Sequence, residues 1–288
     1  MDQQYVINSW LERLHARHSR LGALILTMMG DAFIPRGGAV ALSSILEICA
    51  AMGFAGGAVR TAMSRLQADL WLESNRVGRA SFYAPHARGK PVFAASIKRI
   101  YGPRLTLDEA PLRLIVLDQG AGRDALRTRL ERLGYGQLAP SIMVAPATGP
   151  APELGGGGYV LTASAAASTM RPLATRIWPI TDIATQYRHF IETYEAIQPD
   201  DLATLTPRDA LIARFVLIHD YRLIILNDPA LPNQMLPPDW PGPAARQICA
   251  ALYKSLISAS ESHISDTALG PNGPLPPPNP PLALRFPD

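Results

Sequence analysis

Residues 42–83 read LSSILEICAAMGFAGGAVRTAMSRLQADLWLESNRVGRASFY, and this stretch decides how the N-terminal part of the chain is expected to fold. In residues 42–49, apolar side chains recur at intervals of three and four, which is the spacing of an amphipathic helix. Gly53 then supplies a short turn and a helix stop. A second helical pattern runs over residues 57–69. The sequence therefore predicts two helices joined by a tight turn.

The second predicted helix has two different faces. The face expected to pack on the preceding helix carries Val59, Ala62, Met63, Leu66 and Leu70. The opposite face carries Arg60, Thr61 and Ser64, with Arg65 at its margin. Arginine can donate two hydrogen bonds to guanine, and hydroxyl groups can reach phosphates or base edges. This layout is typical of a helix-turn-helix that reads DNA.

Alternating residues in the range 71–83, around a turn that contains Gly78, predict a β-hairpin after the second helix. Its basic tip would suit a phosphate or the minor groove. We therefore expect a winged helix-turn-helix. The alternative is a plain helical domain with a solvated charged face. The predicted DNA-binding residues are Arg36, Arg60, Thr61, Ser64, Arg65, Arg76, Arg79 and Ser81.

Charge is distributed unevenly along the chain. Residues 1–104 hold 13 Lys/Arg against 6 Asp/Glu, whereas the remaining residues hold 14 against 18. A basic N-terminal third on a mildly acidic remainder indicates that one part of the protein meets a polyanion. This favours nucleic acid as the partner of the N-terminal part.

The composition is that of a globular protein with more than one domain. The chain has 288 residues, of which 48% are hydrophobic and 18% charged. No apolar run is long enough to span a membrane, and no apolar leader segment stands near the N-terminus. Cys49 and Cys249 lie in apolar helical patterns and are expected to be buried free thiols. We therefore expect a cytoplasmic protein.

Several segments of the chain together resemble a known family. In the N-terminal part these are MGDAFIPRGG (29–38), VRTAMSRL (59–66) and GRASFY (78–83), and further along the chain they are RTRLERLGYGQLAP (127–140) and LPPDWPG (236–242). They resemble the N-terminal, middle and C-terminal parts of the PaaX family of phenylacetate-pathway repressors. The resemblance implies a homodimeric repressor of an aromatic-acid catabolic operon. It also implies release from double-stranded operator DNA when an aryl-acetyl-CoA thioester, typically phenylacetyl-CoA, binds.

We expect an α+β protein with four parts. Residues 1–102 would be the winged-helix domain and residues 103–181 a ferredoxin-like middle domain. Residues 182–269 would be a helical C-terminal domain. Residues 270–288, with eight prolines among nineteen residues, predict a disordered tail.

The middle domain is expected to follow a strand-helix-strand, strand-helix-strand order. Its strand patterns lie at 112–118, 141–145 and 159–162, with an Arg-rich helix at 122–133. A short Ala-rich helix and residues 176–179 complete the order.

By family resemblance, this region is similar to small CRISPR-associated ferredoxin-like nucleases. Those enzymes carry an acidic residue at the end of the first strand, where Asp118 stands in this chain. A metal-dependent nuclease is therefore the alternative function. However, only Asp124 is nearby in sequence, and an aspartate at a strand end often caps the next helix. Because other catalytic and metal-binding motifs are missing, we expect no enzyme, no metal and no cofactor.

Three residues are candidates for binding the effector: His219, Arg222 and Trp240. His219 and Arg222 lie on a predicted helix over residues 208–227 and could bind an anion, since arginine offers a planar fork to phosphate. The alternative is that Arg222 pairs with Asp220 or Asp228. Trp240 would either line an aryl pocket or pin its proline-rich loop to the core.

Overall fold

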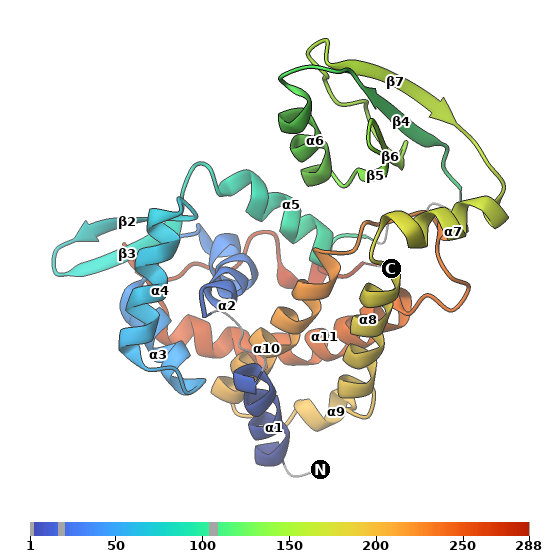
Figure 1. The fold of residues 1–288 in the computed structure, drawn as a ribbon. Helices are drawn as coiled ribbons and strands as arrows, with labels where there is room; N and C mark the ends of the chain where they lie inside the picture. The colour runs from blue at the N-terminus through green and yellow to red at the C-terminus, as the bar shows by residue number, and fades with distance from the viewer. Residues whose placement is uncertain (1–2, 17–20, 104–108, 288) are drawn as a thin grey trace. The chain divides into compact units, whose positions relative to one another are not determined.

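The computed structural model describes residues 3–16, 21–103 and 109–287. Contacts divide the chain into two compact units, each assembled from segments far apart in sequence (Figure 1). The large unit comprises residues 1–103, 189–226 and 244–288, and the small unit residues 104–188 and 227–243. The boundaries expected at 102, 181 and 269 follow chain order, whereas these contacts join the N-terminal third to the C-terminal helices.

The large unit begins with two helices and two irregular helical turns. After them come a short strand, a helix pair, a hairpin and a further helix. These elements are α1 (Gln3–Ala16), α2 (Leu21–Met28), η1 (Met29–Phe33), η2 (Ile34–Arg36), β1 (Val40–Ala41), α3 (Leu42–Ala51), α4 (Gly56–Ala68), β2 (Leu72–Val77), β3 (Ala80–Pro85) and α5 (Lys90–Tyr101).

Helices α3 and α4 form where the apolar spacing predicted them. Helix α4 packs against both α2 and α3. Its buried residues are Val59, Met63 and Leu66. From α3, Ile45 and Cys49 are fully buried, and burial raises the pKa of the Cys49 thiol to about 12. Both cysteines are free and buried, as predicted.

Leu70 lies outside α4, although it was expected on the helix's apolar face. Its φ angle is 59°, in the left-handed region, and its side chain is 36% exposed. The N–H of Leu70 donates to the carbonyl of Gln67, and the N–H of Trp71 donates to that of Leu66. These two bonds are the Schellman motif that closes many helices, usually with glycine at this position.

Strands β2 and β3 form an antiparallel hairpin joined by residues 78 and 79. Strand β1 pairs with the other edge of β3, giving a three-stranded sheet in the order β1-β3-β2. Gly78 has a φ angle of 62°, which a residue with a β carbon adopts poorly. Arg76 lies opposite Ser81 in the register, so the two side chains share one face of the hairpin.

The C-terminal helices are α8 (Ile180–Tyr194), α9 (Pro199–Leu202), α10 (Pro207–Ile225) and α11 (Gly242–Thr267). Helix α8 passes from the small to the large unit after Arg188. In the large unit, the ring of Phe190 contacts the tilted ring of Tyr221, and Tyr194 packs edge-on against Trp10. Of the described residues, no helix is long and apolar enough to cross a membrane.

The proline-rich segment after α11 is packed rather than disordered. It contains β8 (Leu269–Gly270), β9 (Gly273–Pro274) and η4 (Leu282–Leu284). The N–H of Asn279 donates to the carbonyl of Pro35 at 2.7 Å, and the N–H of Phe286 donates to that of Tyr101 at 2.7 Å. Phe286 is only 2% exposed. Prolines exclude long helices and central strands, but they still permit an extended chain to dock through its other residues.

A buried ionic cluster around Asp31 fastens this segment to the large unit. Asp31 accepts bonds from Arg214 (2.7 Å) and Arg285 (2.6 Å), and from the hydroxyls of Tyr101 (2.7 Å) and Tyr253 (2.9 Å). Burial has the largest single effect on the pKa of Asp31, and it raises this pKa because it disfavours the charged carboxylate. Nevertheless the two arginines and the hydroxyls outweigh it, so the pKa of Asp31 lies below its ordinary value.

The small unit is a four-stranded antiparallel sheet with helices. Its strands follow the order β5-β6-β4-β7. The elements are β4 (Leu112–Leu117), α6 (Arg123–Arg132), β5 (Gly136–Ala139), β6 (Ile142–Pro146), β7 (Gly158–Ala163), α7 (Ala167–Ile177) and η3 (Asn233–Met235). Residues 176–179, expected to follow the Ala-rich helix as a strand, are not one, because α7 continues to Ile177. The fourth strand of the sheet is instead β5, a short strand after Gly134 that the sequence pattern did not predict.

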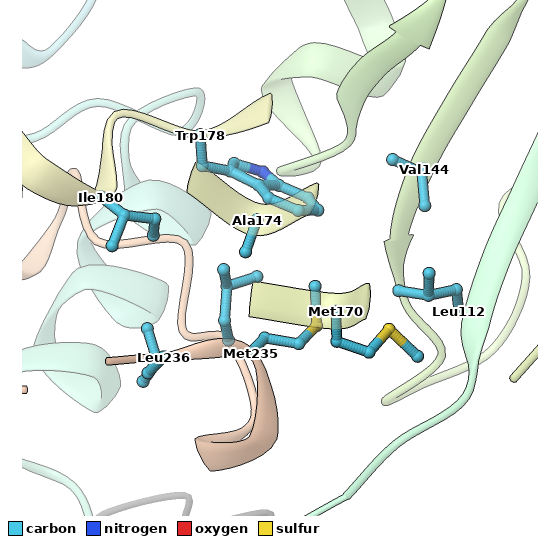
Figure 2. Packing of buried hydrophobic residues seen from close by; sticks show 9 residues of the cluster. Leu112, Val144, Met170, Ala174, Trp178, Ile180, Met235 and Leu236 are labelled. Atoms are coloured by element: carbon cyan, nitrogen blue, oxygen red, sulfur yellow. The ribbon is translucent and has the colours of Figure 1, made fainter. Parts of the chain in front are cut away.

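Two apolar clusters hold the small unit together. One lies between the sheet and α6 and includes Ile115, Leu130 and Met143. The other joins the sheet to α7 and to the proline-rich loop that contains η3, as Figure 2 shows. Its members are Leu112, Val144, Met170, Ala174, Trp178, Ile180, Leu231, Met235 and Leu236.

Candidate nucleic-acid interface

Helix α4 presents the polar face that its sequence predicted. Arg60, Thr61, Ser64 and Arg65 are all exposed. The hydroxyl of Thr61 donates to the carbonyl of Gly57 at 3.0 Å, a local bond that a stronger partner could replace. No side chain caps the first turn of the helix, and it begins with two glycines. Its first backbone amides are therefore accessible to an anion.

The hairpin adds two further cations to the exposed residues of α4. Arg76 and Arg79 are exposed, and Arg76 Nε donates to the carbonyl of Gly78 at 3.2 Å across the turn. Ser81 is half-buried. Acidic side chains are fewer here, with Asp69 and Glu73 exposed between the helix and the tip. The connection from α4 to β2 is short, so the helix and the hairpin belong to one substructure.

Arg36, expected to contact DNA, does not belong to this surface. It is 2% exposed, and its guanidinium pairs with Glu261 and donates to the carbonyl of Ala32 at 3.1 Å. Glu261 also pairs with Arg214, which links Arg36 to the buried cluster around Asp31. The basic, Gly-rich connection in the sequence gave no indication of a partner 225 residues away.

Asp118, the candidate for the alternative nuclease activity, is exposed directly after β4. Its neighbour in sequence, Asp124, pairs with Arg127 at 3.2 Å. Over residues 3–16, 21–103 and 109–287, no three His, Cys, Asp or Glu side chains gather where they could hold a metal ion. No observation in the structure therefore favours metal-dependent chemistry at Asp118.

Of the three effector candidates, His219 and Arg222 lie one turn apart on α10. His219 is fully buried, and its Nδ1 lies 2.9 Å from the hydroxyl of Thr27. Arg222 is half-buried, and in the described part of the chain its guanidinium has no ion pair with Asp220 or Asp228. Those two carboxylates accept hydrogen bonds from Tyr194 and Tyr187 instead. Burial lowers the pKa of Arg222.

Arg222 lines a pocket of about 200 Å³ between α2, α5 and α10. The wall is mainly apolar, with Trp71 and Phe93 among its residues. Trp71 lies in the short connection between α4 and β2, immediately before β2, so it links the predicted DNA-reading helix to the hairpin. Apart from Arg222, these residues could not be predicted as a site from the sequence, because their apolar pattern indicated only core packing.

Trp240, the third effector candidate, lies in the small unit. It packs edge-on against Tyr187, with ring centroids 5.7 Å apart, and against the cluster of Figure 2. Arg188 pairs with Asp239 beside it at 2.8 Å. These contacts correspond to the role of pinning the proline-rich loop.

A helix pair followed by a basic antiparallel hairpin defines a class of proteins whose exposed cationic surface suits a polyanion. Models of known families match the chain in two places: "PaaX-like protein" over residues 20–89 and "PaaX-like protein C-terminal domain" over residues 178–266. The transcriptional repressor PaaX of Escherichia coli (strain K12) is 30% identical over 282 residues, which cover 92% of this chain and 89% of that protein. The chain belongs to the PaaX family.

A solved structure resembles this fold as well. The uncharacterized protein Rv0674 from Mycobacterium tuberculosis matches with a TM-score of 0.51 and 18% sequence identity. The match covers 86% of this chain and 97% of that one. At this identity the likeness concerns the fold alone.

Proposed function

We propose that the protein is a transcriptional repressor that binds duplex DNA through α4 and the β2–β3 hairpin. In this proposal α3 and α4 are a helix-turn-helix, and the hairpin is its wing. The observation that carries the proposal is the shared exposure of Arg60, Ser64 and Arg65 on α4 and of Arg76 and Arg79 on the hairpin. The 30% identity to a transcriptional repressor over most of the chain supports it.

The exposed residues have distinct proposed roles. Arg60, Thr61 and Ser64 read base edges in the major groove, where arginine binds guanine through two hydrogen bonds. Arg65, Arg76, Arg79 and Ser81 contact the backbone or the minor groove. The uncapped N-terminus of α4 can receive a phosphate, because its free amides and helix dipole favour an anion.

The regulated operon and its effector are proposed from the family. The protein would repress a phenylacetate catabolic operon and leave the operator when an aryl-acetyl-CoA thioester such as phenylacetyl-CoA binds. A ligand that binds the DNA-incompetent state more tightly weakens DNA affinity by linkage. His219, Arg222 and Trp240 remain candidates for contacts with this effector.

We further propose a homodimer and a ferredoxin-like small unit. The strand order and antiparallel pairing support the latter, although the second helix follows β7 instead of preceding it. Strand β7 lies at the sheet edge, and its Tyr159 and Leu161 are 65% and 52% exposed. An exposed apolar edge of this kind can pair with a second copy. Sedimentation velocity of the wild-type chain and of Leu161→Glu tests the proposed homodimer.

DNA binding is tested by fluorescence anisotropy with the promoter region upstream of the protein's own gene cluster, at fixed salt. Arg60→Ala should weaken operator binding by about 1–3 kcal/mol and relax specificity at one base pair. Arg208→Ala is the matched control, because Arg208 is an exposed arginine at the start of α10 in the same unit.

Three outcomes separate the parts of the proposal. Release by phenylacetyl-CoA, but not by phenylacetate or acetyl-CoA, supports the proposed effector. Tight binding that none of these disturbs keeps the DNA-binding assignment and rejects that effector. If no operator sequence binds, the repressor assignment is wrong, and Mg²⁺-dependent cleavage by wild type and Asp118→Asn is measured next.

A further inference from the structure

The pocket between α2, α5 and α10 contains a cation without a counter-charge. Arg222 lines it, and within the described residues its guanidinium pairs with no carboxylate; the hydroxyl of Tyr101, which interacts with it electrostatically, donates a hydrogen bond to Asp31. Neither α2 nor α5 contains an acidic residue. Asp31 lies at the wall, but its carboxylate has no solvent exposure and is bound to Arg214 and Arg285. The pocket therefore offers a positive charge with which no carboxylate of the described residues pairs.

The buried ionic cluster around Asp31, which adjoins the pocket, would not repel an anion. It contains three arginines and two acids, which leave one excess positive charge; its members are Arg36, Arg214, Arg285, Asp31 and Glu261. Partly desolvated charges interact more strongly than charges in water. A ligand with one negative charge would compensate Arg222 without meeting a free carboxylate.

The rest of the pocket suits an apolar ring. Trp71 and Phe93 meet edge to face in its wall, with centroids 6.2 Å apart. Val92 and Leu226, also in the lining, are 46% and 36% exposed, so apolar surface remains uncovered there. An engineered cavity of about 150 Å³ accepts benzene. A volume of about 200 Å³ therefore accommodates one ring with a short substituent.

We propose that this pocket binds a small carboxylate that carries a single apolar ring, with the carboxylate on Arg222 and the ring between α2 and α5. The planar guanidinium matches a carboxylate through two parallel hydrogen bonds. The ligand would contact Trp71, which joins α4 to β2, and Thr27 on α2, which packs against α4. The ligand would therefore lie beside residues that adjoin both proposed DNA-contacting elements. The site itself requires no DNA. Its ligand is a free carboxylate and not the proposed thioester, although Arg222 is a candidate contact for both.

The test is calorimetric titration of the DNA-free full chain with phenylacetate as the probe, together with quenching of Trp71 fluorescence. Arg222→Met should weaken phenylacetate binding by about tenfold or more, because a charge-assisted bond is lost. Ser96→Leu should abolish binding by filling the pocket while leaving every charge in place. Arg208→Met is the matched control and should bind like the wild type. Trp71→Phe should keep the calorimetric signal and lose the fluorescence change.

Two ligand controls test the chemistry. Phenethylamine has a similar ring and chain with the opposite charge and should not bind. Coenzyme A without an acyl group should not compete with phenylacetate. The proposal is overturned if phenylacetate does not bind the wild type, if phenethylamine binds equally well, or if Arg222→Met and Ser96→Leu both leave its affinity unchanged.

Discussion

At the scale of single residues, the partner of an arginine decides its role. Arg60 and Arg76 are exposed, with only local backbone carbonyls as partners in the described chain. Arg214 and Arg285 are buried against Asp31. The attraction within a buried ion pair offsets the large cost of removing both charges from water. Removing one partner leaves an uncompensated buried charge, which destabilises the fold, so these arginines have a structural role. Exposed arginines carry no such cost and remain available for phosphate or base edges.

The Asp31 cluster gives the protein a specific pH dependence. Because the pKa of folded Asp31 lies below its unfolded value of about 3.8, the unfolded chain binds the proton first as pH falls. The stabilisation that ionised Asp31 gives the folded state is therefore complete above about pH 5. It is lost below about pH 4, as the pH approaches the pKa of Asp31 in the folded chain. Arg285→Met should lower the free energy of unfolding by about 3 kcal/mol at neutral pH.

Urea unfolding of wild type and Arg285→Met between pH 3 and pH 7 measures this effect. Taking the difference between the two chains removes the titration of other carboxyl groups. The difference should shrink below about pH 4, since protonated Asp31 no longer attracts the arginine. A difference that stays constant down to pH 3 would contradict the assignment of Asp31 as the titrating group.

At the scale of elements, the end of α4 is strained by its own sequence. Leu70 occupies the left-handed position that glycine usually fills. Leu70→Gly should therefore raise the free energy of unfolding by about 0.5–1 kcal/mol, because a β carbon disfavours this conformation. Chemical denaturation measures the change, with Leu70→Ala as the control. Equal stability of the two variants would show that the backbone angle carries no cost.

The hairpin and the helix should differ in how they affect DNA binding. Arg79→Gln should weaken binding to all sequences alike and reduce the salt slope of log affinity by about 1, because one phosphate contact is lost. Arg60→Ala should instead change the preference among sequences. Anisotropy titrations at several salt concentrations, on operator and scrambled duplexes, compare the two. Equal specificity loss in both variants would contradict the division between reading helix and wing.

Local elements were predictable from the sequence because their causes are local. The apolar spacing of residues 42–66 and the turn at Gly78 determine α3, α4 and the hairpin within a few residues. Leu70 was misplaced, since its apolar character fits the helix face and only the Schellman bonds reveal the helix end. Short β5 was missed, because a four-residue strand has too little pattern to detect.

At the scale of the whole molecule, pairings over long sequence separations could not be predicted. Asp31 meets Arg214 across 183 residues and Arg285 across 254 residues. No periodicity connects such positions, so Arg36 resembled a DNA contact and the proline-rich segment resembled a disordered tail. Most residues of the Arg222 pocket come from α2, α5 and α10, and each helix alone shows only an ordinary apolar face.

Removing the proline-rich segment should destabilise the large unit. A chain that ends at Gly270 lacks both Arg285 and the buried ring of Phe286. Its free energy of unfolding should fall by at least about 3 kcal/mol, since Asp31 loses one of its two cations. The control is Leu284→Ser in the full chain, because Leu284 is 67% exposed. An unchanged unfolding midpoint for the shortened chain would contradict a structural role for the segment.

The position of Arg285 also has a consequence for the order of events during synthesis. Asp31 and Arg285 are separated by 254 residues. At a translation rate of about 5–20 residues per second, the ribosome adds Arg285 about 13–50 s after Asp31. The helix pair and hairpin can fold early, but their unit reaches its final stability only after residue 285 has been synthesised. A nascent chain that stalls before residue 285 would therefore carry the proposed DNA-binding surface on an incompletely stabilised unit.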